Sequence, residues 1–167
     1  MRLPDLAAPL ARAFLPDDAA WTRHANPLSV WSRAATLPVL ALAIWSRAWI
    51  GPWAWALVAL LALWLQLNPT LFPPVRPNRG WSWRAVMGER LWTRRRAAPI
   101  PARHARRGVL LSALQVPPLI LLAYGLAEFR LAAALLGGLG VYAAKFAFLE
   151  AMARLHDEVT PAPEAPI

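Results

Sequence analysis

The chain lacks cysteine, and its 167 residues include only one lysine and nine acidic residues. The absence of cysteine excludes disulfides, thiolate metal sites and iron–sulfur clusters. Because Lys145 is the single lysine, the net charge of +9 comes almost entirely from arginine. What the charge means therefore depends on where the arginines fall along the chain.

Apolar residues make up most of the chain. The composition is 58% hydrophobic, with a mean hydropathy of +0.38 and ten tryptophans. These values are too apolar for an ordinary soluble domain of this length and favour a membrane protein. A soluble all-helical bundle with a very apolar core is the alternative.

Four segments are apolar and about long enough to cross ~30 Å of hydrocarbon as helices. They lie at about 30–47, 50–67, 109–127 and 131–149. The first depends on Arg33 and Arg47 reaching the headgroups from its two ends. In this arrangement the tryptophans fall near the span boundaries and none lies in mid-span, as expected for indoles at the membrane interface. The predicted fold is an all-α, four-span membrane domain over residues 1–159, followed by a disordered proline-rich tail at 160–167.

The arginines give the expected orientation. The joins after the first and third spans are short, so the spans pair into two helical hairpins connected by a long polar loop, 68–108. That loop holds ten arginines and one acid, Glu89, whereas each short join holds one arginine. The positive-inside rule places the loop and both termini in the cytoplasm, in a multi-pass protein of the cell's inner (plasma) membrane. The expected partners are the bilayer and its anionic headgroups, with a protein partner or a second copy left open and nucleic acid not expected.

The first helix is predicted to start at "HANP". Asn26 is a typical N-cap, because its side-chain oxygen accepts from a free backbone N–H, and Pro27 suits the first helical position. His24 then stands just outside the cap, where the ordinary interpretation is an interfacial histidine bonded to backbone or water.

Polar residues near the inner boundary are the candidate site. The possible acids, bases or ligands are His24, Glu89 and His104, and the possible binding residues are Asn26, Arg33, Asn68, Arg90 and Lys145. We expect Glu89 to attract Arg33 or Arg90, or, in a catalytic arrangement, an imidazole. Lys145 is expected about one turn from the inner end of its helix, where it can snorkel to the interface. No pair has a helical metal-ligand spacing, so no metal and no cofactor is predicted.

Three further patterns are structural. Pro117-Pro118 predicts a kink, since neither residue can donate a backbone hydrogen bond. Residues 81–96 form a possible interfacial helix. Small residues repeat along the last span and indicate close internal packing or, alternatively, a dimer face; they are Ala133, Gly137, Gly140, Ala144 and Ala147.

Several blocks also resemble an uncharacterised family of small bacterial and archaeal integral membrane proteins. They are "HANPLSVWSR", "LNPTLFPP", "GERLW" with "PIPARH", and "KFAFLEAMARLHDE". The resemblance implies a small multi-span membrane protein without an assigned activity. Where the family has a second histidine after the "PIPARH" block, this chain has Ala105, which weakens a metal interpretation.

Two functions remain. One is a non-catalytic accessory or scaffold protein with a basic cytoplasmic face. The other is a membrane-embedded enzyme, or a small-molecule or lipid-headgroup site, built from His24, Glu89 and His104 with Arg33 and Arg90 holding an anion. A channel or transporter is disfavoured, because no span carries an acid and only Lys145 is ionisable within one.

Overall fold

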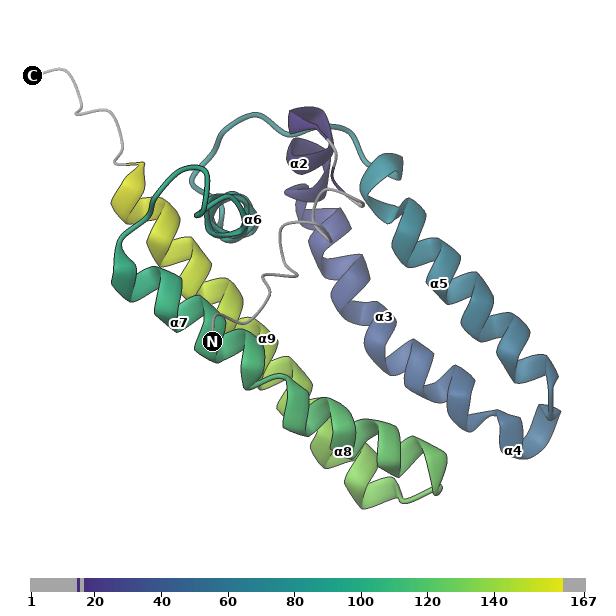
Figure 1. The fold of residues 1–167 in the computed structure, drawn as a ribbon. Helices are drawn as coiled ribbons and strands as arrows, with labels where there is room; N and C mark the ends of the chain where they lie inside the picture. Colours follow the sequence, from purple (N-terminus) through teal and green to yellow (C-terminus); the bar gives the residue numbers. More distant parts are fainter. Residues whose placement is uncertain (1–14, 16, 161–167) are drawn as a thin grey trace, which may run out of the picture.

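The computed structural model describes residue 15 and residues 17–160. This part of the chain contains eight helices and no strand, so the all-α prediction is confirmed (Figure 1). The helices are α2 (Asp18–His24), α3 (Pro27–Trp45), α4 (Arg47–Ile50), α5 (Trp53–Leu71), α6 (Trp81–Thr93), α7 (Ala102–Ala113), α8 (Val116–Ala127) and α9 (Leu131–Val159). Apart from Thr160, the expected disordered tail lies outside the described residues.

Four stretches are long and apolar enough to cross a membrane, as predicted. They are Pro27–Ile50, Trp53–Leu71, Ala102–Ala127 and Leu131–Val159. The last two extend beyond the expected 109–127 and 131–149, because their polar ends stay helical while packing against other parts of the protein. The segment between the second and third spans is consequently 72–101 rather than 68–108.

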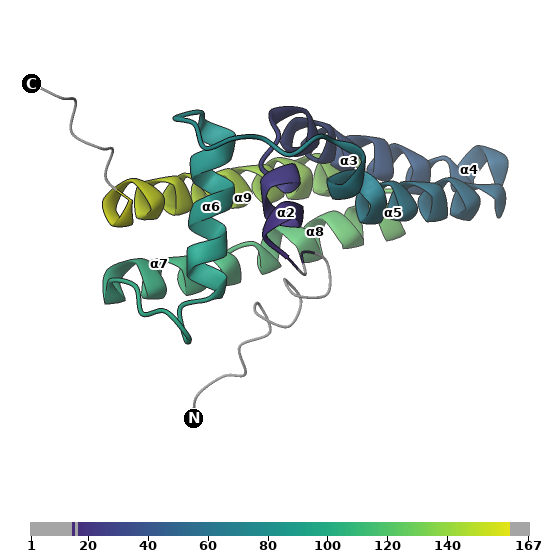
Figure 2. The same ribbon diagram turned by 90° about the horizontal axis from the view of Figure 1, so that it is seen from above.

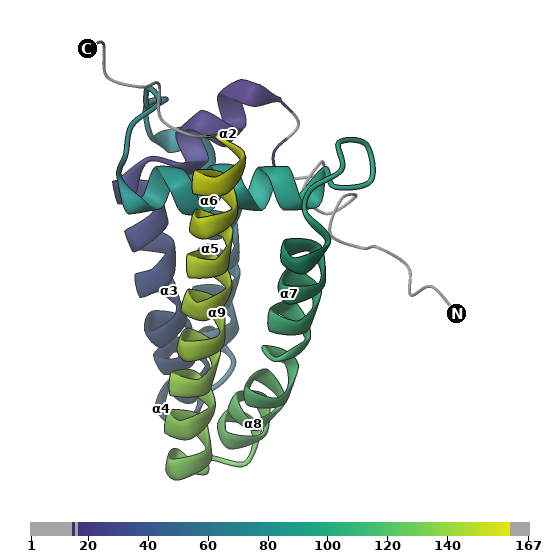
Figure 3. The same ribbon diagram turned by 90° about the vertical axis from the view of Figure 1, so that its left-hand side faces the viewer.

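The long helices run side by side, and α6 lies across one end of them. In Figure 3, α6 lies across the upright helices, and Figure 2 shows the same crossing from above. α5 packs along α3, while α7 and α8 together follow α9. We call the end that holds α2, α6 and Thr160 the α6 end. The opposite end, with the joins 46–52 and 128–130, is the turn end.

The start of α3 follows the predicted capping chemistry. Asn26 Oδ1 accepts from the backbone N–H of Leu28 at 3.0 Å, and Pro27 is the first helical residue. The amide nitrogen of Asn26 also donates to the carbonyl oxygen of Pro73 at 3.1 Å. One side chain therefore starts α3 and fixes the chain that leaves α5.

Buried polar side chains join α3 to α5. Asn68 has no exposed surface; its carbonyl oxygen accepts from the Ser29 hydroxyl at 2.6 Å and its nitrogen donates to Ser32 at 2.9 Å. Hydrogen bonds of this kind hold helices together where water cannot compete. Asn68 is thus satisfied within the fold.

Glycine allows the close approach of α9 to α8. A Cβ added at Gly137 would lie 2.3 Å from the backbone nitrogen of Leu122, and one at Gly140 would lie 2.6 Å from Pro118. The internal-packing interpretation of the small-residue stripe is confirmed at these two positions. The third span bends between Ala113, where α7 ends, and Val116, where α8 begins, directly before the two prolines.

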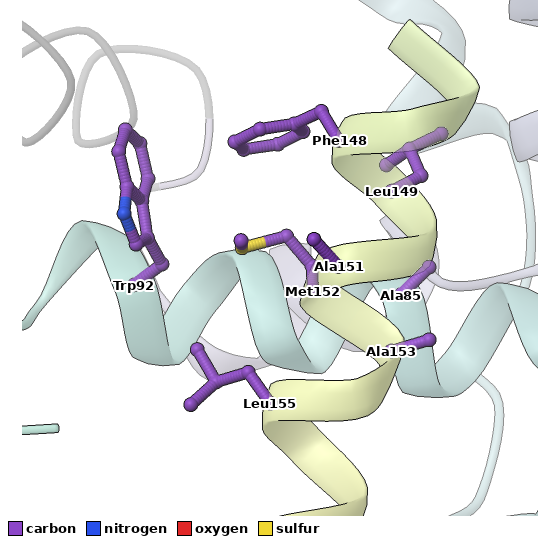
Figure 4. Packing of buried hydrophobic residues seen from close by; sticks show 8 residues of the cluster. All are labelled: Ala85, Trp92, Phe148, Leu149, Ala151, Met152, Ala153 and Leu155. Atoms are coloured by element: carbon purple, nitrogen blue, oxygen red, sulfur yellow. The ribbon is translucent and has the colours of Figure 1, made fainter. Parts of the chain in front are cut away.

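α6 is buried against α9 and α2. Trp92 of α6 meets Phe148 of α9 edge to face at 5.4 Å, within an apolar cluster that includes Met152 and Leu155 (Figure 4). On another side, Trp83 and Met87 pack with Trp21 of α2. The helix expected at 81–96 therefore forms, ending at Thr93, but its apolar residues contact protein.

Candidate functional site

A cavity of about 590 Å³ lies at the α6 end, between α2, α3, α6 and α9. Most of its wall is apolar, including Trp21, Val86 and Leu149. The polar side chains that line it are His24, Arg33, Glu89, Thr93, Tyr142 and Lys145. We call it the polar cavity. Its size is in the range of small-molecule sites, which are mostly apolar with a few placed polar groups.

Arg33 projects from the second turn of α3 and is held by neutral groups. Its Nε donates to the carbonyl oxygen of Ser29 at 3.1 Å, Nη2 donates to the carbonyl oxygen of His24 at 3.3 Å, and Nη1 contacts the His24 ring. These bonds use three of the five N–H donors of a guanidinium. Among the described residues, Arg33 has no carboxylate in an ion pair.

The surroundings of His24 favour the neutral form of its imidazole. Arg33 Nη1 lies 2.5 Å from Nδ1 and 2.8 Å from Nε2 of the ring, so one ring nitrogen accepts the guanidinium hydrogen. Burial lowers the pKa of His24 well below its usual value, and the charges of Arg33 and Lys145 lower it further. An imidazole that stays neutral adds no charge to the cavity.

Glu89 forms its ion pair with Lys145, and not with Arg33, Arg90 or an imidazole as expected, although its charge acts on Arg33. Lys145 Nζ lies 3.6 Å from Glu89 Oε1, whereas Arg90 turns to Asp18 of α2 and Arg33 to His24. Lys145 is also not one turn from a helix end, because α9 continues to Val159. It reaches Glu89 of α6 instead of snorkelling.

The polar cavity carries more positive than negative charge. Lys145 and Glu89 offset each other and His24 adds no charge, so the charge of Arg33 remains. Arg33 and Lys145 contribute two positive charges and Glu89 one negative charge, so the lining carries one net positive charge. Glu89 acts on both Arg33 and Lys145, but one carboxylate offsets only one of the two cations. A partly buried cation that is not offset is stabilised when a negative group approaches it. The arrangement suits an anion.

His104 lies elsewhere. It is buried at the start of α7, and its Nε2 is 2.8 Å from Glu158 Oε2, which Arg103 also contacts at 2.5 Å. This cluster ties α7 to the last turn of α9. The structure thus brings together His24, Arg33, Glu89 and Lys145 of the candidate residues, and leaves Asn26, Asn68, Arg90 and His104 outside the cavity lining.

No group of three or more His, Cys, Asp or Glu residues in the described part of the chain is arranged to hold a metal ion. The polar cavity offers one carboxylate and one imidazole, and the imidazole is bonded to Arg33. Catalysis by an imidazole–carboxylate pair is also not prepared there, because the imidazole contacts a cation rather than Glu89.

An apolar groove of about 520 Å³ lies further along α3, between α3 and α8. Its wall includes Leu40 and Ile44 of α3 and Leu122 and Ala123 of α8. Leu37 lines both the groove and the polar cavity. Of the residues that the structure describes, Leu37 is the one that the two linings share.

Sequence reasoning missed Tyr142 and α2. The Tyr142 hydroxyl donates to the carbonyl oxygen of Ala34 at 2.5 Å and closes one side of the polar cavity. α2 places His24 in the wall; its signal was Asp17, whose side chain caps the helix by accepting from Ala20 at 2.7 Å. An aspartate before "DAAW" is a recognisable helix start.

The fold and the site define a small multi-pass helical membrane protein with a polar cavity near one end of its bundle. The chain belongs to the Family of unknown function (DUF6653), which matches residues 5–166 and confirms the expected relationship to an uncharacterised family. Comparisons with curated proteins and with solved structures find no match.

Proposed function

We propose that the α6 end faces the cytoplasm of a cell whose plasma membrane contains this protein. The segment 72–101 carries Arg76, Arg79, Arg84, Arg90, Arg94, Arg95 and Arg96, whereas Arg47 and Arg130 are the arginines at the turn end. Such an asymmetry is typical of the cytoplasmic side of membrane proteins. The exposed arginines at this end would also attract anionic headgroups.

Cysteine labelling tests the orientation, because the natural chain contains no cysteine. Ala98→Cys lies in the join before α7, and Ala48→Cys lies at the turn end; both positions are exposed. A membrane-impermeant maleimide applied to intact cells should label Ala48→Cys and leave Ala98→Cys unlabelled until the cells are opened. Labelling of both positions from outside would overturn the orientation.

For the biochemical role, we propose the binding of a small anionic molecule in the polar cavity, without catalysis. The observation that carries the proposal is Arg33, a partly buried guanidinium with two unused donors in a cavity of one net positive charge. Guanidinium groups bind carboxylates and phosphates through paired hydrogen bonds. We prefer this role to a scaffold because these polar residues converge on a partly open cavity rather than spreading over a flat face.

Thermal unfolding of the detergent-purified protein tests the site, with hexanoate and dibutyl phosphate as anionic probes and hexanol as the neutral control. A ligand that binds only the folded protein raises Tm with its concentration. We expect at least one of the two anions to raise Tm and hexanol to have no effect. Equal shifts with hexanol would contradict an anion site.

Two substitutions sharpen the test. Arg33→Gln should abolish the anion-dependent shift, whereas Arg23→Gln, which removes an arginine outside the cavity lining, should retain it. Glu89→Gln raises the net charge of the cavity to two positives and should strengthen anion binding. A purely structural Glu89 would not have this effect, so unchanged or weaker binding in that variant would count against the proposal.

A further inference from the structure

The face of α3 that lines the polar cavity and the groove changes from charged to apolar along the helix. Arg33 and Leu37 are four residues apart and so lie one above the other on the helix. Leu40, Ala41 and Ile44 continue the same face, since they follow Leu37 at spacings of three, four and seven. A ligand that meets Arg33 with a charged group can therefore lay an apolar chain along α3 into the groove.

The groove is bounded at the turn end. Arg47 donates to the carbonyl oxygens of Leu126 at 2.5 Å and Ala127 at 2.7 Å, which joins α3 to α8 there. From Arg33 to Ile44 the helix rises about 16 Å, at ~1.5 Å per residue. This is about half of a ~30 Å hydrocarbon layer, the depth that one leaflet's acyl chains fill.

The charge and the wall of the polar cavity restrict which charged group of a ligand can bind beside Arg33. One net positive charge is neutralised by a single negative charge, and Arg33 has two unused N–H donors, the number that a carboxylate with two oxygens can accept. Much of the surrounding wall is apolar, with Val30, Val86 and Leu149, and suits the first methylenes of an alkyl chain.

We infer that the occupant is a long-chain carboxylate, with its carboxylate at Arg33 in the polar cavity and its alkyl chain in the groove between α3 and α8. This inference rests on the anion-binding function and adds the class of ligand and the path of its chain. Leu37 marks the junction between the two parts of the site.

Photolabelling of the full-length protein in detergent tests the inference. The probe is palmitate with a diazirine in the middle of its chain, and labelled peptides are located by mass spectrometry. We expect adducts to concentrate on residues 37–47 and 119–127. Unlabelled palmitate should reduce this labelling at least ~tenfold, whereas hexadecanol, which has the same chain without the charge, should not.

Matched variants separate the two ends of the site. Arg33→Gln removes the contact for the carboxylate, and Ala123→Phe fills the groove without touching the polar cavity; each should remove the concentrated labelling. Ala59→Phe makes the same change at an exposed position of α5 that lines neither space, and should leave the labelling intact. Any variant that unfolds is identified by its thermal unfolding curve, and the Ala123→Phe arm does not depend on folding of the Arg33 variant.

Each other result has a definite meaning. Labelling spread evenly over the exposed leucines of α5 would overturn the chain path, and the anion site would survive if hexanoate still raised Tm. Loss of both would remove the proposed function as well. Phosphatidylglycerol competing better than palmitate at equal mole fraction would identify a phospholipid as the occupant and overturn the assignment to a carboxylate.

Discussion

The hydroxyl of Tyr142 on α9 donates a hydrogen bond of 2.5 Å to the carbonyl oxygen of Ala34 on α3. This carbonyl lies four residues before Pro38, which sits inside α3 and has no backbone N–H to offer it. The proline therefore frees an acceptor, and a tyrosine from another span occupies it. The bond ties the two helix pairs together beside the polar cavity.

Tyr142→Phe should consequently lower the free energy of unfolding by about 0.5–1.5 kcal/mol, the usual worth of one such bond. Pro38→Ala restores an N–H for Ala34, so the loss caused by Tyr142→Phe should be smaller in the Pro38→Ala background. A double-mutant cycle by denaturant unfolding in mixed micelles measures the difference. Equal losses in both backgrounds would show that the freed carbonyl is not what Tyr142 satisfies.

The crossing of α6 over α9 depends on the absence of a side chain at Gly88. A Cβ there would stand 1.8 Å from the carbonyl oxygen of Met152, so backbone would have to move. Gly88→Ala should cost about 1–3 kcal/mol or more through overpacking. Gly138→Ala is the control: its added Cβ meets nothing within 4 Å, and loss of glycine within a helix should stabilise by up to ~1 kcal/mol. Thermal unfolding of the two variants should shift in opposite directions.

Asn26 has two separable roles, as helix cap and as donor to Pro73. Asn26→Ala loses both, with ~1 kcal/mol expected from the cap alone. Asn26→Asp keeps the capping acceptor but has no N–H for the carbonyl of Pro73, so its unfolding free energy should fall between those of Asn26→Ala and the natural protein. Full recovery with aspartate would mean that the Pro73 contact contributes nothing measurable.

His24 makes stability depend on pH. Because its pKa is lowered in the folded protein, the unfolded chain takes up a proton first, near its ordinary value of about 6.5. Stability should therefore be complete above that pH and decrease as the pH falls from 7 to 5. His24→Gln cannot titrate, and its Tm should fall less over this range. Parallel curves for the two proteins would show that His24 is not a buried neutral group.

Local patterns in the sequence determined the spans and one helix start. Apolar length and the lack of charge are properties of each segment by itself, since a helix must satisfy its own backbone in lipid. Capping at Asn26 is equally local, because donor and acceptor lie two residues apart. These expectations needed no knowledge of neighbouring helices.

The ends of the spans were less predictable. α9 extends to Val159 although its last turns carry Glu150, Asp157 and Glu158, because Trp81, Arg84 and His104 from other helices contact these acids. A prediction from hydropathy ends the span where charged residues begin. Only the tertiary partners explain why the helix continues.

The site was decided by tertiary structure in the same way. The sequence offered Arg33, Arg90 and two histidines as partners for Glu89 with nothing to separate them, and the folded chain pairs Glu89 with Lys145, 56 residues away, while Asp18 takes Arg90. The apolar length of each span follows from the sequence, since it depends on composition and local hydropathy. Which charges meet depends on how α6 packs against the other helices. That Leu37 lines both a polar cavity and an apolar groove depends also on how α8 packs, and no spacing along the chain encodes either arrangement.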